Sequence, residues 1–168
     1  MSFCETAKGR YSCRGYKNTE VRHDDLEYIL ECARIAPSAC NLQPWKIYVV
    51  RDEKLRGAVC GAYPRDWLKD APMIAVFCGL RGENWMRAGG TDYLMCDIAI
   101  IADHFINAAH ERGLGTCWIA AFDESRLASA LNLPENEKPY IMTPLGYAAG
   151  TAHEIKKRKS IGDICCFI

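Results

Sequence analysis

The sequence has no excess of charge of either sign. Its 168 residues include 21 basic and 21 acidic side chains, so the formal net charge is zero. A neutral chain has no overall attraction to nucleic acid or to an anionic membrane, although a local basic patch can still bind an anion. The first ten residues, MSFCETAKGR, also lack the apolar stretch of a signal peptide. We therefore expect a cytoplasmic protein that has neither a nucleic acid nor a membrane as its partner.

Several motifs that carry common chemistry are also missing. The sequence contains no C-x-x-C pair and only four histidines, without the spacing of a metal site. It has neither of the glycine-rich loops that cradle phosphate, and no G-x-S-x-G nucleophile turn. No metal is therefore expected, and a phosphate group would have to be bound in another way. The ten cysteines are expected to be reduced thiols that pack mostly as small apolar side chains.

The residues that are present predict one globular domain over 1–168. Hydrophobic residues make up 49% and charged residues 25% of the chain, and no linker or repeat interrupts it. Periodicity predicts helices over 24–35, 53–62, 92–112 and 123–131. It predicts strands over 45–50, 73–79, 116–122 and within 140–150, with the terminal ICCFI (164–168) as a fifth candidate. This order indicates an α+β domain with three layers, α/β/α.

The segment 92–112 is apolar nearly all round its helix. A helix of that kind is buried on every side, and Asp97, Asp103 and His104 make a membrane span improbable. A chain of this length has too few other elements to cover such a helix alone. We therefore expect a second copy of the chain to complete the burial, which makes the protein a homodimer.

Basic residues gather at both ends of the chain. Residues 1–22 and 154–168 together hold nine cationic and four anionic side chains. Arg10, Ser12 and Arg14 alternate, so an extended segment would place two guanidinium groups and a hydroxyl on one side, a set that suits phosphate. The run KKRK (156–159) could meet the same anion. The alternatives are a solvated N-terminal arm and a solvated or anion-attracting C-terminal tail.

A polar loop joins the first predicted helix to the first predicted strand. Its sequence, APSACNLQPW (36–45), places Ser, Asn and Gln in otherwise apolar surroundings. Loops held by a rigid scaffold often bind ligands, although a capped turn would explain the same residues.

Four sequence blocks follow one another in a set order. They are R-x-S-x-R (10–14), A-P-S-A-x-N-x-Q-P-W (36–45), G-L-G-T-C-W-I (113–119), and G-Y (146–147) ahead of K-x-R (156–158). Together they resemble the nitroreductase family of FMN-dependent oxidoreductases, over about residues 8–164. The resemblance implies a mixed central sheet flanked by helices, and a long buried helix in a homodimer with shared active sites. It also implies FMN as cofactor and NAD(P)H as electron donor.

The resemblance assigns cofactor-binding roles residue by residue. Positions matching the site of the FMN phosphate and ribityl chain are Arg10, Tyr11, Ser12, Arg14, Lys156 and Arg158. Tyr11 stands where the family more often has a second basic residue. The N-terminal arm (1–22) and the C-terminal arm (151–168) would thus contribute to the cofactor site and the dimer.

A second set matches positions around the flavin ring. Pro37, Ser38 and Ala39 match a loop that the other subunit places against the isoalloxazine, and Asn41 matches an amide that contacts the ring. Ala120 and Ala121 match a strand end whose backbone N–H faces flavin N5, where the family often has glycine. No catalytic side chain is expected, because the flavin itself carries the chemistry.

The implied activity is hydride transfer from NAD(P)H, through flavin N5, to a small-molecule acceptor such as a nitroaromatic or a quinone, by a ping-pong mechanism. The alternatives are a specialised flavin enzyme of the same fold, such as a dehalogenase or dehydrogenase, and a flavin-binding or redox-sensing protein without turnover. Trp85, Met86 and Arg87 are expected at the substrate mouth. Aromatic side chains expected in the core are Trp45, Trp118 and Phe122.

The last four residues, Cys165–Ile168, have the form of a prenylation box behind a polybasic run. The second position of this box is cysteine rather than an aliphatic residue. A terminal strand, or an arm that clasps the partner, is therefore the preferred interpretation.

Overall fold

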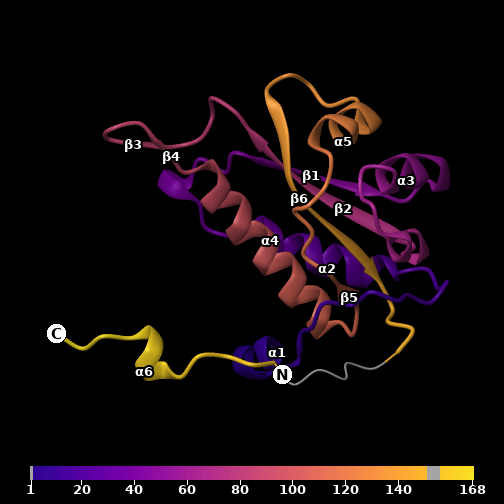
Figure 1. The fold of residues 1–168 in the computed structure, drawn as a ribbon, viewed down its shortest axis with the longest axis horizontal. Helices are drawn as coiled ribbons and strands as arrows, with labels where there is room; N and C mark the ends of the chain where they lie inside the picture. The colour runs from indigo at the N-terminus through magenta and orange to yellow at the C-terminus, as the bar shows by residue number, and fades with distance from the viewer. Residues whose placement is uncertain (1, 151–155) are drawn as a thin grey trace.

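A four-stranded antiparallel sheet forms the centre of the protein (Figure 1). The computed structural model describes residues 2–150 and 156–168. The strand order is β1-β2-β6-β5. The strands are β1 (Trp45–Val50), β2 (Met73–Leu80), β5 (Gly115–Thr116) and β6 (Glu137–Gly146), and a separate hairpin joins β3 (Met86–Arg87) to β4 (Thr91–Asp92). β2 lies between β1 and β6, and nearly all of its side chains are buried.

Helices cover both faces of the sheet. One face carries α2 (His23–Arg34) and α4 (Leu94–Glu111), and the other carries α3 (Glu53–Cys60) and α5 (Glu124–Leu131). Successive side chains of a strand point to opposite faces. Met73, Ala75 and Phe77 of β2 accordingly pack in the first layer, and Ile74, Val76 and Cys78 pack in the second. The predicted three-layer α+β architecture is confirmed.

The long helix α4 is covered on one side only. Its inner face packs on α2 and the sheet, where the rings of Phe77 and Phe105 meet edge to face with centroids 5.3 Å apart. Met95, Cys96 and Asp103 are exposed on the other side. One chain therefore leaves a stripe of α4 uncovered, as expected for a chain with too few other elements, and burial by a second copy stays a prediction.

The strand predicted over 116–122 is much shorter than expected. β5 ends at Thr116, and beyond it only an isolated bridge joins Ile119 to Met142. The neighbouring strand explains this break, because Pro144 has no N–H to donate and the Thr143 hydroxyl accepts the N–H of Cys117 at 3.1 Å. Trp118, expected in the core, is 37% exposed as a result.

The parallel component of the sheet is small. All pairs between named strands are antiparallel. In the described part of the chain, the parallel pairing is an isolated bridge between Ser12 and Thr116, where the Cys13 N–H donates to the Thr116 carbonyl at 2.8 Å. The mixed character expected of the sheet therefore comes from the N-terminal segment lying along β5.

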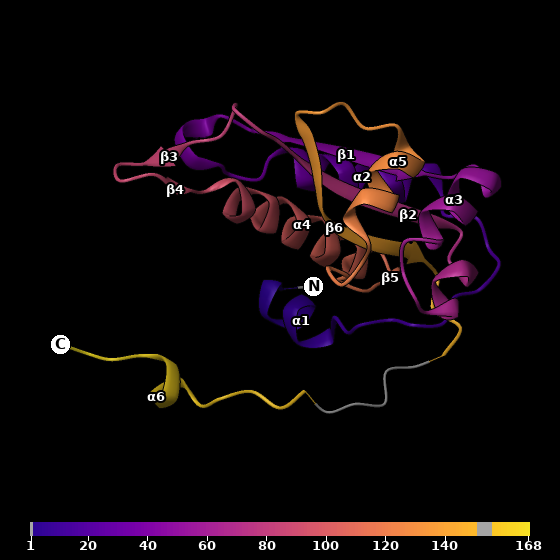
Figure 2. The ribbon, with the colours of Figure 1, turned by 45° about the horizontal axis from the view of Figure 1, so that its top comes forward.

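The two ends of the chain carry short helices that the periodicity did not predict. Ser2 and Glu5 form a capping box at the start of α1 (Phe3–Gly9), and Ser160 and Asp163 form another at α6 (Ile161–Ile164). The strand expected over 164–168 is absent, because this segment extends away from the sheet and has no strand edge beside it (Figure 2). Two 3-10 turns, η1 (Ala39–Asn41) and η2 (Asp66–Asp70), complete the elements.

Among the described residues, no helix is both long and apolar enough to cross a membrane.

Candidate functional site

The two basic ends of the chain meet at the C-terminus of α1. The Lys156 ammonium group donates to the carbonyls of Ala7 and Lys8 at 3.0 and 2.8 Å. These carbonyls belong to the last turn of α1, where helix geometry leaves acceptors free and favours a cation. Arg10 is the residue that ends this helix. Residues nearly 150 positions apart in the sequence are thus brought together, as the charge distribution predicted.

Several cations crowd around Lys156. Burial and the neighbouring Arg10 and Arg158 lower the pKa of Lys156. Burial also lowers the pKa of His110, and the charges of Lys156 and Arg10 lower it further. None of the ion pairs among the described residues involves these cations. A cluster of cations that repel one another is stabilised by a bound anion, so the donor set fits a phosphate group.

Ser12 and Arg14 extend this cluster towards the end of β5. Both are exposed, whereas Cys13 between them is 2% exposed, so the segment alternates as an extended strand does. Burial raises the pKa of the Cys117 thiol, and the nearby Arg14 guanidinium and Ser12 hydroxyl oppose that increase. The arginines and the serine of the first motif therefore face the segment that leads to Ala120 and Ala121.

Tyr11 has a different contact from its neighbours. Its hydroxyl donates to the carbonyl of Gly150 at 3.3 Å. Burial and the adjacent Cys13 raise the pKa of this phenol, so it remains a neutral donor. Tyr11 therefore ties the N-terminal segment to the segment that follows β6, rather than adding a charge to the basic cluster.

Ala120 and Ala121 lie directly after the Ile119 bridge and are exposed. In the part of the chain that the structure describes, their backbone N–H groups donate to no carbonyl. Because β5 stops early, these two N–H groups are available to an external acceptor.

The polar loop after α2 has an unusual backbone. Cys40, Asn41 and Gln43 have φ values of 51°, 55° and 51°, in the left-handed region that side chains with a Cβ avoid. Local bonds shape the turn, since the Ser38 hydroxyl accepts the Gln43 N–H at 2.9 Å and the Ser38 carbonyl accepts the Asn41 N–H at 3.0 Å. Pro37 and Asn41 are exposed, and Ser38 and Ala39 are half-buried.

The loop and the basic cluster lie at opposite ends of α4 (Figures 1 and 2). The Ala39 N–H donates to the carboxylate of Asp97, in the first turn of α4, at 2.9 Å. At the other end of α4, His110 packs so closely on Gly9 that an added Cβ there would overlap its ring. Asp97 and His110 are 13 residues apart, which corresponds to about 20 Å of helix. A single chain therefore does not bring the loop 37–43 and the basic cluster together.

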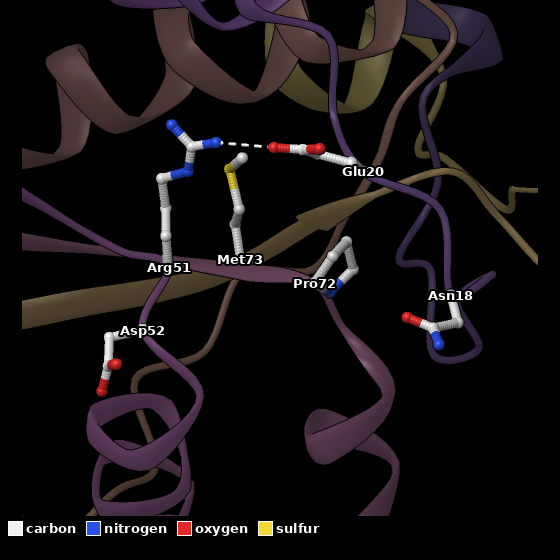
Figure 3. Close-up of a pocket in the computed structure, with 6 residues that line it drawn as sticks. All are labelled: Asn18, Glu20, Arg51, Asp52, Pro72 and Met73. Atoms are coloured by element: carbon white, nitrogen blue, oxygen red, sulfur yellow. Dashed lines mark hydrogen bonds and ion pairs between the residues drawn. The ribbon is translucent and has the colours of Figure 1, made fainter.

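A cavity of about 430 Å³ lies elsewhere on the molecule (Figure 3). Its lining residues are Asn18, Glu20, Arg51, Asp52, Pro72 and Met73. Glu20 and Arg51 pair with each other at 2.8 Å, and Asp52 caps α3 by accepting the Leu55 N–H at 2.8 Å. The charged groups of this cavity are thus engaged in the fold, and none of the predicted site residues lines it.

Comparison with known proteins identifies the family. The model of the nitroreductase family matches residues 7–64 and 60–147. The chain belongs to the nitroreductase family. A Methanothermobacter thermautotrophicus protein named for NADH dehydrogenase and NAD(P)H nitroreductase activity is 30% identical over 154 residues, covering 89% of this chain and 78% of that relative.

Solved structures of nitroreductases have the same fold. A nitroreductase family protein of Clostridium difficile 630 is similar with a TM-score of 0.90 and 31% identity, covering 99% of this chain and 98% of that one. An FMN-dependent nitroreductase of Clostridium difficile R20291 has a TM-score of 0.78 and 27% identity, with coverages of 95% and 93%. The predicted family and fold are confirmed, and this nitroreductase-family chain is an oxidoreductase.

Sequence reasoning missed two residues that lie beside the predicted site residues, Asp97 at Ala39 and His110 near Arg10 and Lys156. Asp97 counted only as a polar interruption of an apolar helix, and His110 was excluded as a metal ligand and considered no further. Asp97 could have been recognised from the sequence, because a carboxylate in the first turn of an otherwise apolar helix indicates a specific role. Nothing in the sequence indicates that His110 lies beside Arg10 and Lys156.

Proposed function

We propose that the protein is an NAD(P)H-dependent FMN oxidoreductase that reduces a small-molecule acceptor, such as a nitroaromatic or quinone, at two sites shared by a homodimer. The observation that carries this proposal is the cluster of cations at the end of α1, which has the chemistry of a phosphate site. We keep a cytoplasmic location as part of the proposal, and the ten free cysteines are in keeping with a reducing compartment.

The phosphate would be held by Arg10, Ser12 and Arg14 from the N-terminal arm, and by Lys156 and Arg158 from the C-terminal arm. The guanidinium forks can bind phosphate oxygens in pairs, and Lys156 adds a point charge. Binding would relieve the repulsion that lowers the pKa of Lys156. Tyr11 would act indirectly, by fixing the arm against Gly150.

The flavin ring would lie between two chains. Ala120 and Ala121 of one subunit would offer backbone N–H groups to N5, and Pro37, Ser38, Ala39 and Asn41 of the other would cover the ring. Bound FMN would supply the redox chemistry, accepting a hydride from NAD(P)H and passing it to the acceptor in two separate steps. The added Cβ of Ala121, compared with glycine, would narrow the approach to the N5 side.

A second copy of the chain would cover apolar surface that one chain leaves open. The exposed stripe of α4 includes Met95, and the C-terminal segment exposes four large apolar side chains. They are Ile161, Ile164, Phe167 and Ile168. Apolar side chains gathered in this way mark interaction sites in soluble proteins. An interface that covered both regions would be of the obligate type.

The purified protein tests this proposal directly. We expect a flavin absorbance band that bleaches on anaerobic addition of NADH or NADPH and returns when a nitroaromatic or quinone is added. A band that persists with both donors would favour the flavin-binding or sensing alternative. No FMN binding, even with added cofactor, would overturn the proposal. An FMN-bound monomer in sedimentation at micromolar protein would overturn the shared site.

A further inference from the structure

Asp97 is a buried carboxylate in a helix that is otherwise almost entirely apolar on its inner face. Its exposed fraction is 2%, although it lies only four positions into α4. Oδ1 accepts the Ala39 N–H at 2.9 Å, and Oδ2 has no hydrogen-bond partner among the described residues. Burial of a carboxylate is unfavourable unless hydrogen bonds compensate for the loss of water. This residue is therefore costly to the fold, and a function would explain its presence.

The loop that Asp97 holds cannot keep its shape from local bonds alone. Three of its residues have left-handed φ values without being glycine, a conformation that persists only where the surroundings enforce it. The other hydrogen bonds of residues 37–43 stay within the loop or reach its immediate neighbours. In the described part of the chain, the bond from Ala39 to Asp97 is the one that ties this loop to a distant element.

We propose that Asp97 is a positioning residue that fixes the loop 37–43 in the conformation that covers the flavin of the other subunit. The role of the loop towards FMN rests on the proposed function, whereas the fixing of the loop does not. The carboxylate acts through the backbone of Ala39 and need not touch the cofactor.

Substitutions at Asp97 separate the hydrogen bond from the charge. Asp97→Asn keeps an acceptor oxygen for the Ala39 N–H, whereas Asp97→Ala removes it. Ala39→Pro removes the donor and leaves the carboxylate in place. Proline is tolerated there because Ser38 has the extended backbone, with φ −138° and ψ 162°, that precedes proline readily. Asp24→Ala is the matched control, since Asp24 is an exposed carboxylate in the first turn of α2.

Amide hydrogen exchange in the apoprotein tests the fixing of the loop without any cofactor. We expect exchange at residues 40–43 to become about tenfold faster or more in Asp97→Ala and Ala39→Pro, since each removes the hydrogen bond that ties the loop to α4. Asp97→Asn should stay within about threefold of wild type, and Asp24→Ala should not change exchange. Unchanged exchange in both Asp97→Ala and Ala39→Pro would overturn the proposal.

FMN titration then tests what the fixed loop does. The dissociation constant for FMN should rise about tenfold or more in Asp97→Ala and much less in Asp97→Asn. A purely structural role would lower the melting temperature in both variants without separating their FMN affinities, and that result would overturn the positioning role. If the wild type binds no FMN, the proposed function fails, and the exchange experiment still decides whether Asp97 holds the loop.

Discussion

Lys156 is the residue at which the two ends of the chain make contact. Its ammonium group donates to two carbonyls at the end of α1, beside Arg10. The following lysines, Lys157 and Lys159, are exposed, which is the behaviour expected of a solvated run. Within the basic run KKRK, Lys156 thus makes specific contacts, whereas Lys157 and Lys159 are exposed to solvent. Its sequence alone could not make that distinction.

Removing Lys156 should weaken FMN binding selectively. We expect Lys156→Ala to raise the dissociation constant for FMN about tenfold or more, because a charge-assisted contact with the phosphate is lost. Lys159→Ala, a matched change in the same run, should leave the constant within about twofold. Fluorescence titration of the apoprotein measures both. Equal effects of the two substitutions would indicate that Lys156, like Lys159, is a solvated residue with no specific contact to FMN.

The pH dependence of binding gives an independent test of the same residue. Repulsion and burial lower the pKa of Lys156 in the free protein, and a bound phosphate should raise it again. The contribution of Lys156 to FMN affinity should therefore be complete below its free-state pKa and be lost as the pH rises through the bound-state pKa. Titrations at alkaline pH should show this loss in the wild type and not in Lys156→Ala.

At the scale of the elements, the hairpin of β3 and β4 lies beside the loop that covers the flavin in the proposed site (Figures 1 and 2). Trp85 and Tyr93 meet edge to face with centroids 5.0 Å apart, and the Arg87 guanidinium lies 4.6 Å from the centre of the Tyr93 ring. Tyr93 is the residue before α4, one turn from Asp97. Trp85, Arg87 and Tyr93 thus form an aromatic surface with one cation. Its role as the substrate mouth stays a prediction.

This arrangement should favour planar acceptors that carry a negative group. Arg87→Gln is expected to raise KM for a nitrobenzoate several-fold, because the guanidinium would pair with the carboxylate, and to leave KM for an uncharged nitrobenzene nearly unchanged. The kcat values should be similar, since Arg87 is expected at the substrate mouth rather than at the flavin. Steady-state kinetics with both acceptors measures the contrast. An equal increase in both KM values would show that Arg87 does not recognise the negative group of the acceptor.

The elements that the sequence predicted well are those with long, regular periodicity. The helix over 92–112 and the strands over 45–50 and 73–79 agree with α4, β1 and β2 to within two residues, because their side chains repeat against a single core. The strand over 116–122 failed because its length depends on Thr143 and Pro144 in a neighbouring strand. α1 was missed although its capping box, Ser2 and Glu5, is visible in the sequence.

Specific contacts between distant residues could not be predicted from the sequence either, because they too depend on other parts of the chain. The bond from Ala39 to Asp97 joins positions 58 residues apart, and periodicity gives no information about such a pair. The meeting of Arg10 and Lys156 was predicted because both ends of the chain carry positive charge that one anion would draw together, and because the family resemblance assigns both residues to the same phosphate. A charge excess at two distant segments is visible in the sequence, whereas a single hydrogen bond is not.

At the scale of the whole molecule, α4 separates the two parts of the proposed site. The basic cluster lies at its C-terminal end and the loop 37–43 at its N-terminal end, so one chain supplies two incomplete halves. In a symmetric dimer, each half would be completed by the opposite half of the partner, and both sites would be equivalent. The dimer would then be required for activity and not only for stability.

Complementation between two inactive variants tests this arrangement. One chain carries Lys156→Ala with Arg158→Ala. The other carries Ser38→Trp, which places an indole on the loop and removes the hydroxyl that accepts the Gln43 N–H. Each homodimer has two defective sites. A mixed dimer has one site that combines the intact basic cluster of one chain with the intact loop of the other. Co-expression should therefore restore about a quarter of wild-type activity, because half of the dimers are mixed and each has one working site.

The control places all three substitutions in one chain and pairs that chain with either single-defect variant. No site in such a dimer combines an intact cluster with an intact loop, so no activity should return. If each site were built within one chain, co-expression of the first two variants would give no more activity than the variants have separately. Recovery of activity in the first mixture and its absence in the control would together require that the loop of one chain serves the flavin of the other.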